Sequence, residues 1–381
     1  MTMFLAIVFQ APSCLSATES SDWFYNPFNK NSAHHRSIGS GAEYAASDHP
    51  ATLDFLQGKA LNINVGYKPW GCGIWESKPD DPLFEITYES PNHNGSTSEF
   101  PVTCRLPLNM VMKQRLDGVR QFDGVLVVYD RTADKIHHLR QFNWHTDTPA
   151  PNSKPTASSH KTWDIRGIGQ GTRLGAGVGT SASGVAAMFG ILRGWEVKAT
   201  GHPIGHALQM VLPRHPGDFA MMLGREVWWP AVSMDGSAYK AADHNTGHIP
   251  YGSLWAIPPV NKGGPDLTKL GLSEKGLRLA ECIRDYGIYV VDGGASPSIR
   301  ADQDFDDELV KELKTNTAIF YKYIRMVVNS VPETGKVIFK PGDSRFHPTG
   351  GPNKQIIPGQ FPAGGGTPLA PNTAIINRKN Q

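Results

Sequence analysis

Short stretches in which apolar and polar residues alternate are the main pattern along this chain. Residues 61–65 (LNINV) and 84–88 (FEITY) have the two-residue period of half-buried strands. Residues 125–129 form a continuous apolar run, which a polar turn at 131–134 joins to a second segment at 135–142. This arrangement predicts a β-hairpin whose first strand is buried. We expect further strands at 207–212, 226–229, 288–291 and 319–328.

The helical pattern is clearest at 273–286. Apolar residues recur at i, i+3, i+4 and i+7 from Leu279, and Gly287 follows at the position where helices commonly end. A second helix is expected at 306–314. Residues 185–197 predict one or two short helices, interrupted by glycines.

Composition adds a fold class to these elements. The 381 residues include 40 glycines and 29 prolines, more than ordinary usage, which indicates many short elements joined by tight turns. We expect a mainly β fold, a jelly-roll-like antiparallel β-sandwich with a few short helices. Residues 18–331 would form a single domain, and the Pro- and Gly-rich residues 332–381 a tail that wraps it. The formal net charge is +2 without a long basic run, so nucleic acid is not an expected partner.

The first 17 residues predict export. The short apolar run from Met3 to Phe9 is followed by small and polar residues, as in a secretory signal peptide, and is too brief to span a bilayer. The alternatives are a misassigned start and a buried first strand, since no Lys or Arg precedes the run. We expect an extracellular or periplasmic protein with no membrane span.

Export has consequences for the cysteines. An exported chain tends to pair them, and Cys72 and Cys104 lie in turn-rich sequence, so we expect a disulfide between these two. Cys282 lies in the helical pattern and reads as a small buried hydrophobe. Residues 94–96 (NGS) form a glycosylation sequon.

Three blocks in the middle of the chain carry a resemblance to known sequences. They are the hairpin block from Val127 to Leu139, the T-S-A-S-G block at 180–184 with R-x-x-E-V and H-A-L after it, and the Y-G and D-G pairs at 286–287 and 292–293. In order and spacing the chain resembles a widespread group of secreted microbial proteins, largely actinobacterial, of unassigned function. The chain departs from that group at 185–187, where it reads VAA and not GLP. The resemblance implies export and one compact β-rich domain, and it implies no reaction.

His206 is the first candidate for a catalytic residue. An imidazole tied to a carboxylate by one nitrogen, with the other nitrogen facing a cleft, serves as a general base near neutral pH. Asp292, at a predicted strand end, and Glu196 are the candidate carboxylates. The alternative interpretations are a core histidine with both nitrogens satisfied and a helix-terminal salt bridge for Glu196.

Cationic and phenolic groups complete a candidate site for polysaccharide cleavage by β-elimination. Arg36 or Arg193 would neutralise a uronate carboxylate, Tyr251 would act as the acid, and His35 lies in the same N-terminal loop as Arg36. Hydrolysis is slightly less favoured, because it requires two facing carboxylates and no convincing pair stands out. The alternative for the N-terminal loop is an exposed polar segment.

Tryptophans suggest the substrate class. Trp70, Trp75 and Trp144 are the candidates for sugar contact, because a flat ring with an apolar face suits a sugar ring. The alternative is a core filled by large residues. No cofactor is expected, although a loop-built zinc site from the histidine pairs His202/His206 and His244/His248 is a second option.

Together these patterns predict a secreted, carbohydrate-active protein that degrades a polysaccharide. The alternatives are a non-catalytic glycan-binding or surface protein and a metal-dependent hydrolase. The expected partner is a polysaccharide or oligosaccharide.

Overall fold

The structure, a computed structural model, describes most of the chain between its two ends. The described residues are 22–66, 71–89, 100–110, 124–170, 181–214, 221–235, 244–331 and 336–338. The expected signal peptide, the sequon at 94–96, Trp70 and nearly all of the expected tail lie outside these ranges. Within them, no helix combines the length and apolar character that crossing a membrane requires.

The largest sheet has six strands in the order β1-β14-β9-β13-β12-β15. Strands β1 and β14 are parallel, as are β9 and β13, whereas the remaining pairs are antiparallel. The two central strands, β9 and β13, are almost wholly buried, as expected for strands covered on both faces. The strands are β1 (Asn62–Val65), β9 (Leu208–Pro213), β12 (Leu254–Ala256), β13 (Ile288–Gly294), β14 (Ser298–Ala301) and β15 (Arg325–Met326).

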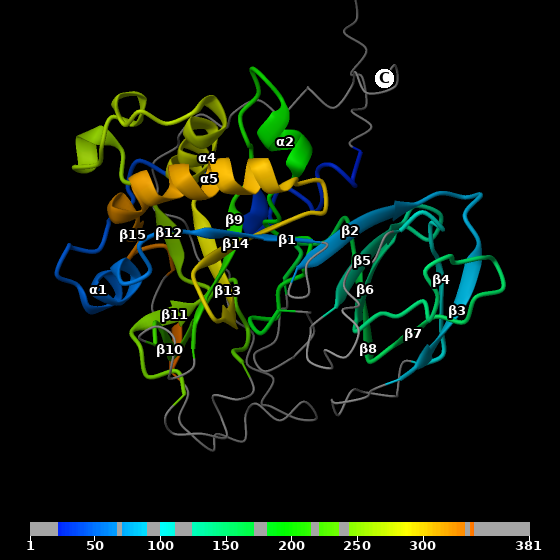
Figure 1. Cartoon of the computed structure of the whole chain (residues 1–381). Coiled ribbons are helices and arrows are strands. Elements are labelled where there is room, and N and C mark those ends of the chain that lie inside the picture. Colours follow the sequence, from blue (N-terminus) through cyan, green and yellow to red (C-terminus); the bar gives the residue numbers. More distant parts are fainter. Residues whose placement is uncertain are drawn as a thin grey trace, which may run out of the picture.

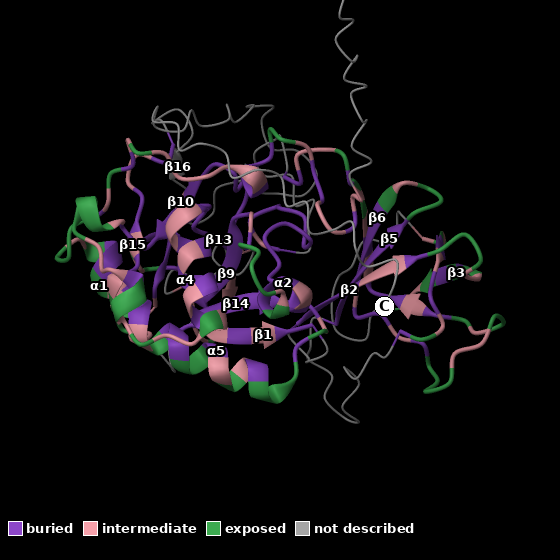
Figure 2. Cartoon of the chain, turned by 90° about the horizontal axis from the view of Figure 1, so that it is seen from above, coloured by how far each residue is buried: buried purple, intermediate pink, exposed green. Residues whose placement is uncertain are grey.

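Two helices, α4 (Glu274–Asp285) and α5 (Asp307–Phe320), pack side by side on this sheet (Figure 1). The outward side of α5 is exposed, while the strands beneath are buried (Figure 2). Ser273 caps the start of the α4 helix, where its hydroxyl accepts a hydrogen bond from the amide of Gly276, and Gly287 follows the helix with φ 78°. The shorter helices are α1 (Pro50–Leu56), α2 (Gly194–Lys198) and the 3-10 turns at Ala33–His35, Val260–Lys262, Leu267–Lys269 and Tyr321–Tyr323.

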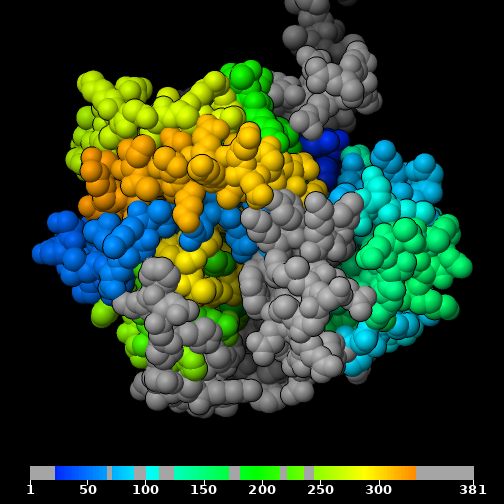
Figure 3. All heavy atoms as spheres, in the orientation of Figure 1, coloured from blue at the N-terminus to red at the C-terminus, as the bar shows by residue number. Residues whose placement is uncertain are grey.

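A second lobe holds a small β-sandwich, seen beside the main sheet in Figure 1 and as an adjoining group of cyan and green spheres in Figure 3. One sheet has the order β2-β5-β6-β8 and the other β4-β3-β7. We call these two sheets the small sandwich. Its strands are β2 (Cys72–Ser77), β3 (Leu83–Tyr88), β4 (Val102–Arg105), β5 (Val125–Asp130), β6 (Lys135–Arg140), β7 (Thr156–Ala157) and β8 (Ser159–Asp164). A further three-stranded sheet joins β10 (Leu223–Trp228), β11 (Ile249–Tyr251) and β16 (Lys336–Ile338).

The four-stranded sheet separates two hydrophobic cores. Leu126 and Val128 face the core of the small sandwich, which also contains Phe84. Val127 and Tyr129 point to the opposite face and join the large core around the six-stranded sheet. This division follows from the alternation of side chains along a strand.

The expected hairpin and the helix at 273–286 are confirmed. The expected fold class is confirmed in part: strands outnumber helices among the described elements, but the described sheets are mixed and do not form a clear antiparallel jelly roll. The chain is a mixed α/β protein, and five strand pairs among the described residues are parallel: β1/β14, β9/β13, β2/β5, β10/β11 and β3/β7. The strand expected at 319–328 is also wrong over most of its length. The helix begun at Asp307 continues to Phe320, because Leu309, Leu313 and Phe320 extend its buried face, and only Arg325–Met326 form a strand there. Of the helices expected at 185–197, only α2 forms.

Candidate functional site

The predicted pairing of His206 with Glu196 is present. Glu196 lies in the first turn of α2, where its carboxylate also accepts the backbone amide of Arg193 at 3.1 Å. His206 lies two residues before the start of β9, and its Nε2 lies 3.1 Å from both carboxylate oxygens. Its Nδ1 lies 2.9 Å from the carbonyl oxygen of Ala207, which can only accept a hydrogen bond.

The imidazole of His206 is therefore held as a cation with both nitrogens bonded. Burial by itself lowers the pKa of His206, but the neighbouring Glu196 outweighs burial and the pKa lies above its ordinary value. The residue is only 7% exposed. A ring with two occupied nitrogens and so little exposure has no free nitrogen to accept a proton from a substrate.

A second histidine, His34, lies against this ring. The two rings stack with centroids 4.3 Å apart, and Nδ1 of His34 accepts the backbone amide of Gly190 at 3.1 Å. Burial is the main reason that the pKa of His34 lies well below its ordinary value, and the nearby His206 lowers it further. A neutral imidazole thus packs on a charged one. The sequence analysis selected His35 from this loop, and its Nε2 contacts the carbonyl oxygens of Pro27 and Phe28 at 2.8 and 3.2 Å.

Arg193 is engaged in a buried ion pair. Its Nε donates to Asp302 at 2.9 Å, and the other carboxylate oxygen of Asp302 accepts the amide of Gly194 at 3.0 Å. Both side chains are buried, so the guanidinium is not presented to a substrate. The sequence analysis missed Asp302, because nothing in the local pattern connects it with a residue 109 positions earlier.

The other predicted catalytic residues do not join His206. Asp292 accepts from Arg300 at 2.6 Å and from the amide of Gly293, so its predicted role in orienting His206 is wrong. The hydroxyl of Tyr251 is buried and accepts from Asn245 at 3.2 Å, and burial raises the pKa of the phenol far above its usual range. The Arg36 guanidinium lies over the ring of Trp229, 4.9 Å from its centroid.

The buried polar cluster formed by Glu196 and His206 also bonds to the neighbouring helix α4, as expected for residues that stabilise the fold. The carbonyl oxygens of Glu196 and Val197 accept from the Arg278 guanidinium at 3.3 and 2.6 Å. The carbonyl oxygen of His206 accepts from the Cys282 thiol at 3.2 Å. Arg278 and Cys282 both belong to α4, so the cluster attaches α2, α4 and the start of β9 to one another.

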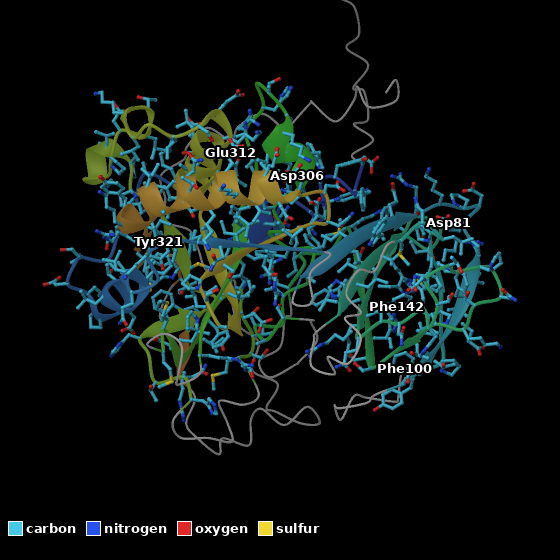
Figure 4. The ribbon with its side chains drawn as sticks, viewed as in Figure 1. Asp81, Phe100, Phe142, Asp306, Glu312 and Tyr321 are labelled. Carbon is cyan, nitrogen blue, oxygen red and sulfur yellow. The ribbon has the colours of Figure 1, made fainter. Side chains whose placement is uncertain are left out.

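A surface groove lies at a different place, on the edge of the small sandwich. It has a volume of about 370 Å³ and is lined by Trp75, Glu76, Lys78, Asp81, Pro107, Leu108 and Asn109. Trp75 belongs to β2, the edge strand of the four-stranded sheet, and packs partly against the core of the small sandwich. Asp81 lies on the outer side of that lobe, and Phe142 lies farther from this edge (Figure 4). An aromatic ring and several polar side chains thus meet at one groove.

The polar side chains of the groove are held in place by short contacts. One carboxylate oxygen of Asp81 accepts the amide of Lys78 at 2.7 Å, and its carbonyl oxygen accepts from Arg105 at 2.8 Å. Glu76 accepts from Nε of Arg131 at 2.6 Å. Burial raises the pKa of Glu76, although Arg131 opposes that shift. The groove is therefore largely formed before any ligand arrives.

The structure separates the tryptophans proposed for sugar contact. Trp75 lines the groove, but Trp144 is buried in the core of the small sandwich with its ring against Phe84 and Phe142 at centroid distances of 5.0 and 5.2 Å. The role predicted for Trp144 is wrong, because a sealed ring cannot meet a sugar. Trp70 lies outside the described residues.

The predicted disulfide is wrong as well. Cys72, Cys104 and Cys282 are all free and buried. Cys72 packs in the large core and Cys104 in the core of the small sandwich, on different sides of the four-stranded sheet. Burial raises the pKa of Cys72 to about 12 and raises the pKa values of the other two thiols.

The paired histidines do not form the zinc site considered from sequence. His206 is bonded to Glu196, and Nδ1 of the exposed His248 lies 2.9 Å from Asp54. Within the described ranges, the one group of three ligand-type side chains close enough to share an ion is Cys104, Asp130 and His137.

Comparison with known proteins adds no family: no family model, curated protein or solved structure matches this chain.

Proposed function

We propose that this protein binds a neutral carbohydrate in the groove at Trp75. The observation that carries the proposal is the position of one tryptophan ring in a groove of about 370 Å³ among Asp81, Asn109 and Lys78. This volume falls in the range of small-molecule sites, roughly 300–1,000 Å³. The apolar face of a sugar ring stacks on an indole, and carboxylate, amide and ammonium groups bond its hydroxyls.

The charges around the groove favour a neutral sugar over a uronate. Glu76 and Asp81 supply two carboxylates, and Lys78 is the one cation among the described residues that line the same groove. A uronate carboxylate would therefore face like charges. A neutral sugar takes hydrogen bonds from the same groups without that cost.

Binding is better supported than cleavage. The β-elimination scheme needs His206 to take a proton from a substrate, and both nitrogens of that buried ring are bonded. Polysaccharide degradation, with a lyase ahead of a hydrolase, stays a prediction from sequence. Export, which would bring the protein to extracellular glycans, also stays a prediction.

Calorimetric titration with a panel of neutral and uronate-containing oligosaccharides tests the proposal. We expect a neutral member to bind, and Trp75→Ala to weaken it about tenfold or more, as for a central aromatic anchor. Trp163→Ala is the matched control, because Trp163 lies in the same sheet but packs against the large core. Trp75→Phe should retain part of the binding.

The same samples distinguish the alternatives. Release of reducing ends or of unsaturated uronate from any polysaccharide would favour the enzyme. If no sugar binds, or if Trp75→Ala binds as tightly as the unaltered protein, the proposal is wrong.

A further inference from the structure

The small sandwich brings three different metal-ligand side chains together between its sheets. Cys104 comes from β4, Asp130 from the end of β5 and His137 from β6. One ligand atom from each, the thiol sulfur, a carboxylate oxygen and a ring nitrogen, lies within 4.8 Å of the others. All three residues are buried.

Strand register explains why they meet. His137 pairs with Val128 across the hairpin, and Asp130 lies two residues along β5 from Val128. Side chains two residues apart share a face, so both residues point toward the core of the small sandwich. Cys104 belongs to that core and reaches it from the opposing sheet.

His137 has a ring nitrogen that no other side chain uses. Its Nε2 is buried without a hydrogen-bond partner among the described residues, while its Nδ1 lies 3.0 Å from Nε2 of His160. When Nδ1 carries the proton and donates it to His160, Nε2 keeps its lone pair. This is the arrangement of metal-binding histidines, whose second nitrogen donates to a supporting group.

Asp130 is fixed in orientation without using both of its oxygens. Oδ1 accepts the backbone amides of Thr132 and Ala133 at 2.9 and 3.0 Å, in the turn of the hairpin. A carboxylate oriented by its backbone is preorganised to offer its second oxygen to an ion. A thiol, an oriented carboxylate and a histidine that keeps one ring nitrogen unpaired among the described residues thus lie together in one buried place.

We propose that Cys104, Asp130 and His137 bind a zinc ion between the two sheets of the small sandwich. Sulfur, imidazole nitrogen and carboxylate oxygen are the three donor types that zinc takes in proteins. A thiolate and a carboxylate together neutralise the two charges of the ion, so the complex is neutral in a buried place where net charge is costly. Ligands at about 2.0–2.3 Å from zinc require only a modest closure of the present spacing, and the fourth position is left to water.

The ion would connect the two sheets. Its three ligands come from strands of both, and a site assembled by folding adds its binding energy to stability. The site is distinct from the sugar groove, and neither proposal depends on the other.

Zinc titration of the full, chelator-stripped protein tests the proposal. We expect one tightly held zinc ion per chain by elemental analysis, and a higher midpoint of thermal unfolding when zinc is added. Cobalt in place of zinc should give the near-ultraviolet absorption of a cobalt–thiolate bond. Cys104→Ser and His137→Gln should each weaken zinc about tenfold or more, and Cys104→Ser should abolish that absorption.

Cys72→Ser is the matched control, since Cys72 is an equally buried free thiol in the other core. It should bind zinc and cobalt like the unaltered protein. If Cys104→Ser does not fold, the cobalt spectrum of the unaltered protein and of Cys72→Ser still decides. A cobalt protein without thiolate absorption, or zinc binding that survives in both Cys104→Ser and His137→Gln, would overturn the site.

Discussion

The Nε2 atom of His206 lies 3.1 Å from both oxygens of the Glu196 carboxylate, and the two side chains are buried together beside the ring of His34. A charged pair removed from water stabilises a fold only while both partners remain. The pair sits at the junction of α2, α4 and β9, so its effects are expected in stability first.

Replacing Glu196 with glutamine should lower the free energy of unfolding by about 3 kcal/mol near pH 6, because a buried imidazolium then loses its partner. Urea denaturation measures this value. Glu274→Gln is the control, since the side chain of Glu274 is 68% exposed in its contact with Arg278. Its loss should be below about 1 kcal/mol.

The pair should also give stability a defined pH dependence. The pKa of His206 is raised in the folded state, so its contribution is complete below the ordinary histidine value of 6.5 and declines as pH rises through the folded value. The difference between the unaltered protein and Glu196→Gln should therefore shrink above neutral pH. A difference that stays constant from pH 6 to alkaline pH would contradict the charged state assigned to His206.

His34 should act in the opposite direction. Its pKa is lowered in the folded state by burial and by the neighbouring His206, His35 and Arg193 side chains, so folding is disfavoured as pH falls below 6.5. His34→Phe leaves the Gly190 amide without its acceptor and should cost about 1–3 kcal/mol at pH 8. Below pH 6.5, the free energy of unfolding of His34→Phe should fall less steeply with decreasing pH than that of the unaltered protein. If the free energy of unfolding of the two proteins has the same pH dependence below pH 6.5, His34 is not the group that destabilises the fold in acid.

Gly287, which follows α4, should not tolerate a side chain. Its φ is 78°, and an added Cβ would lie 2.6 Å from Leu254 Cδ1 and 2.9 Å from the carbonyl oxygen of Trp255. Gly287→Ala should lose more than the 1–2 kcal/mol or so that a left-handed conformation costs. Gly271→Ala separates the two causes, because its φ of 71° is similar but no atom lies within 4 Å of the added Cβ. Equal losses of unfolding free energy in the two variants would contradict the steric argument.

The free thiols give a chemical test of the fold. Iodoacetamide added in denaturant without reductant should label both Cys72 and Cys104, which are buried and unpaired in the folded protein. Peptide mass spectrometry measures the labelling. A linked Cys72–Cys104 peptide would restore the disulfide expected from sequence and contradict the structure.

Local sequence patterns predicted the elements whose causes are local. The α4 helix has its cap at Ser273, its apolar stripe and Gly287 within one short segment, and the β5–β6 hairpin needs only its own turn. The parallel pairing of β9 with β13 joins segments about 80 residues apart, and no residue in either strand specifies its partner. Periodicity gives the faces of a strand but leaves its neighbours open.

The same limit explains the mixed outcome for the candidate residues. Glu196 and His206 are ten positions apart and were matched correctly. Asp292 was assigned to His206 from its place at a predicted strand end, whereas its side chain bonds Arg300 of β14, a strand separated from β13 by β9, and no local signal connects the two. Trp75 and Trp144 look alike in sequence, and only the packing of the small sandwich determines that one lines a groove and the other fills a core.

At its centre, the four-stranded sheet of the small sandwich is covered by a hydrophobic core on each of its two faces. Val128 belongs to one core and Val127 to the other, so strand β5 is common to both halves of the molecule. A fragment containing only residues 72–164 would expose the side chains of β5 that pack in the large core, such as Val127 and Tyr129. Such a fragment should be prone to aggregate. Both lobes should therefore unfold together in a single cooperative thermal transition. Neither lobe can be replaced without changing the residues of the four-stranded sheet that pack in both cores.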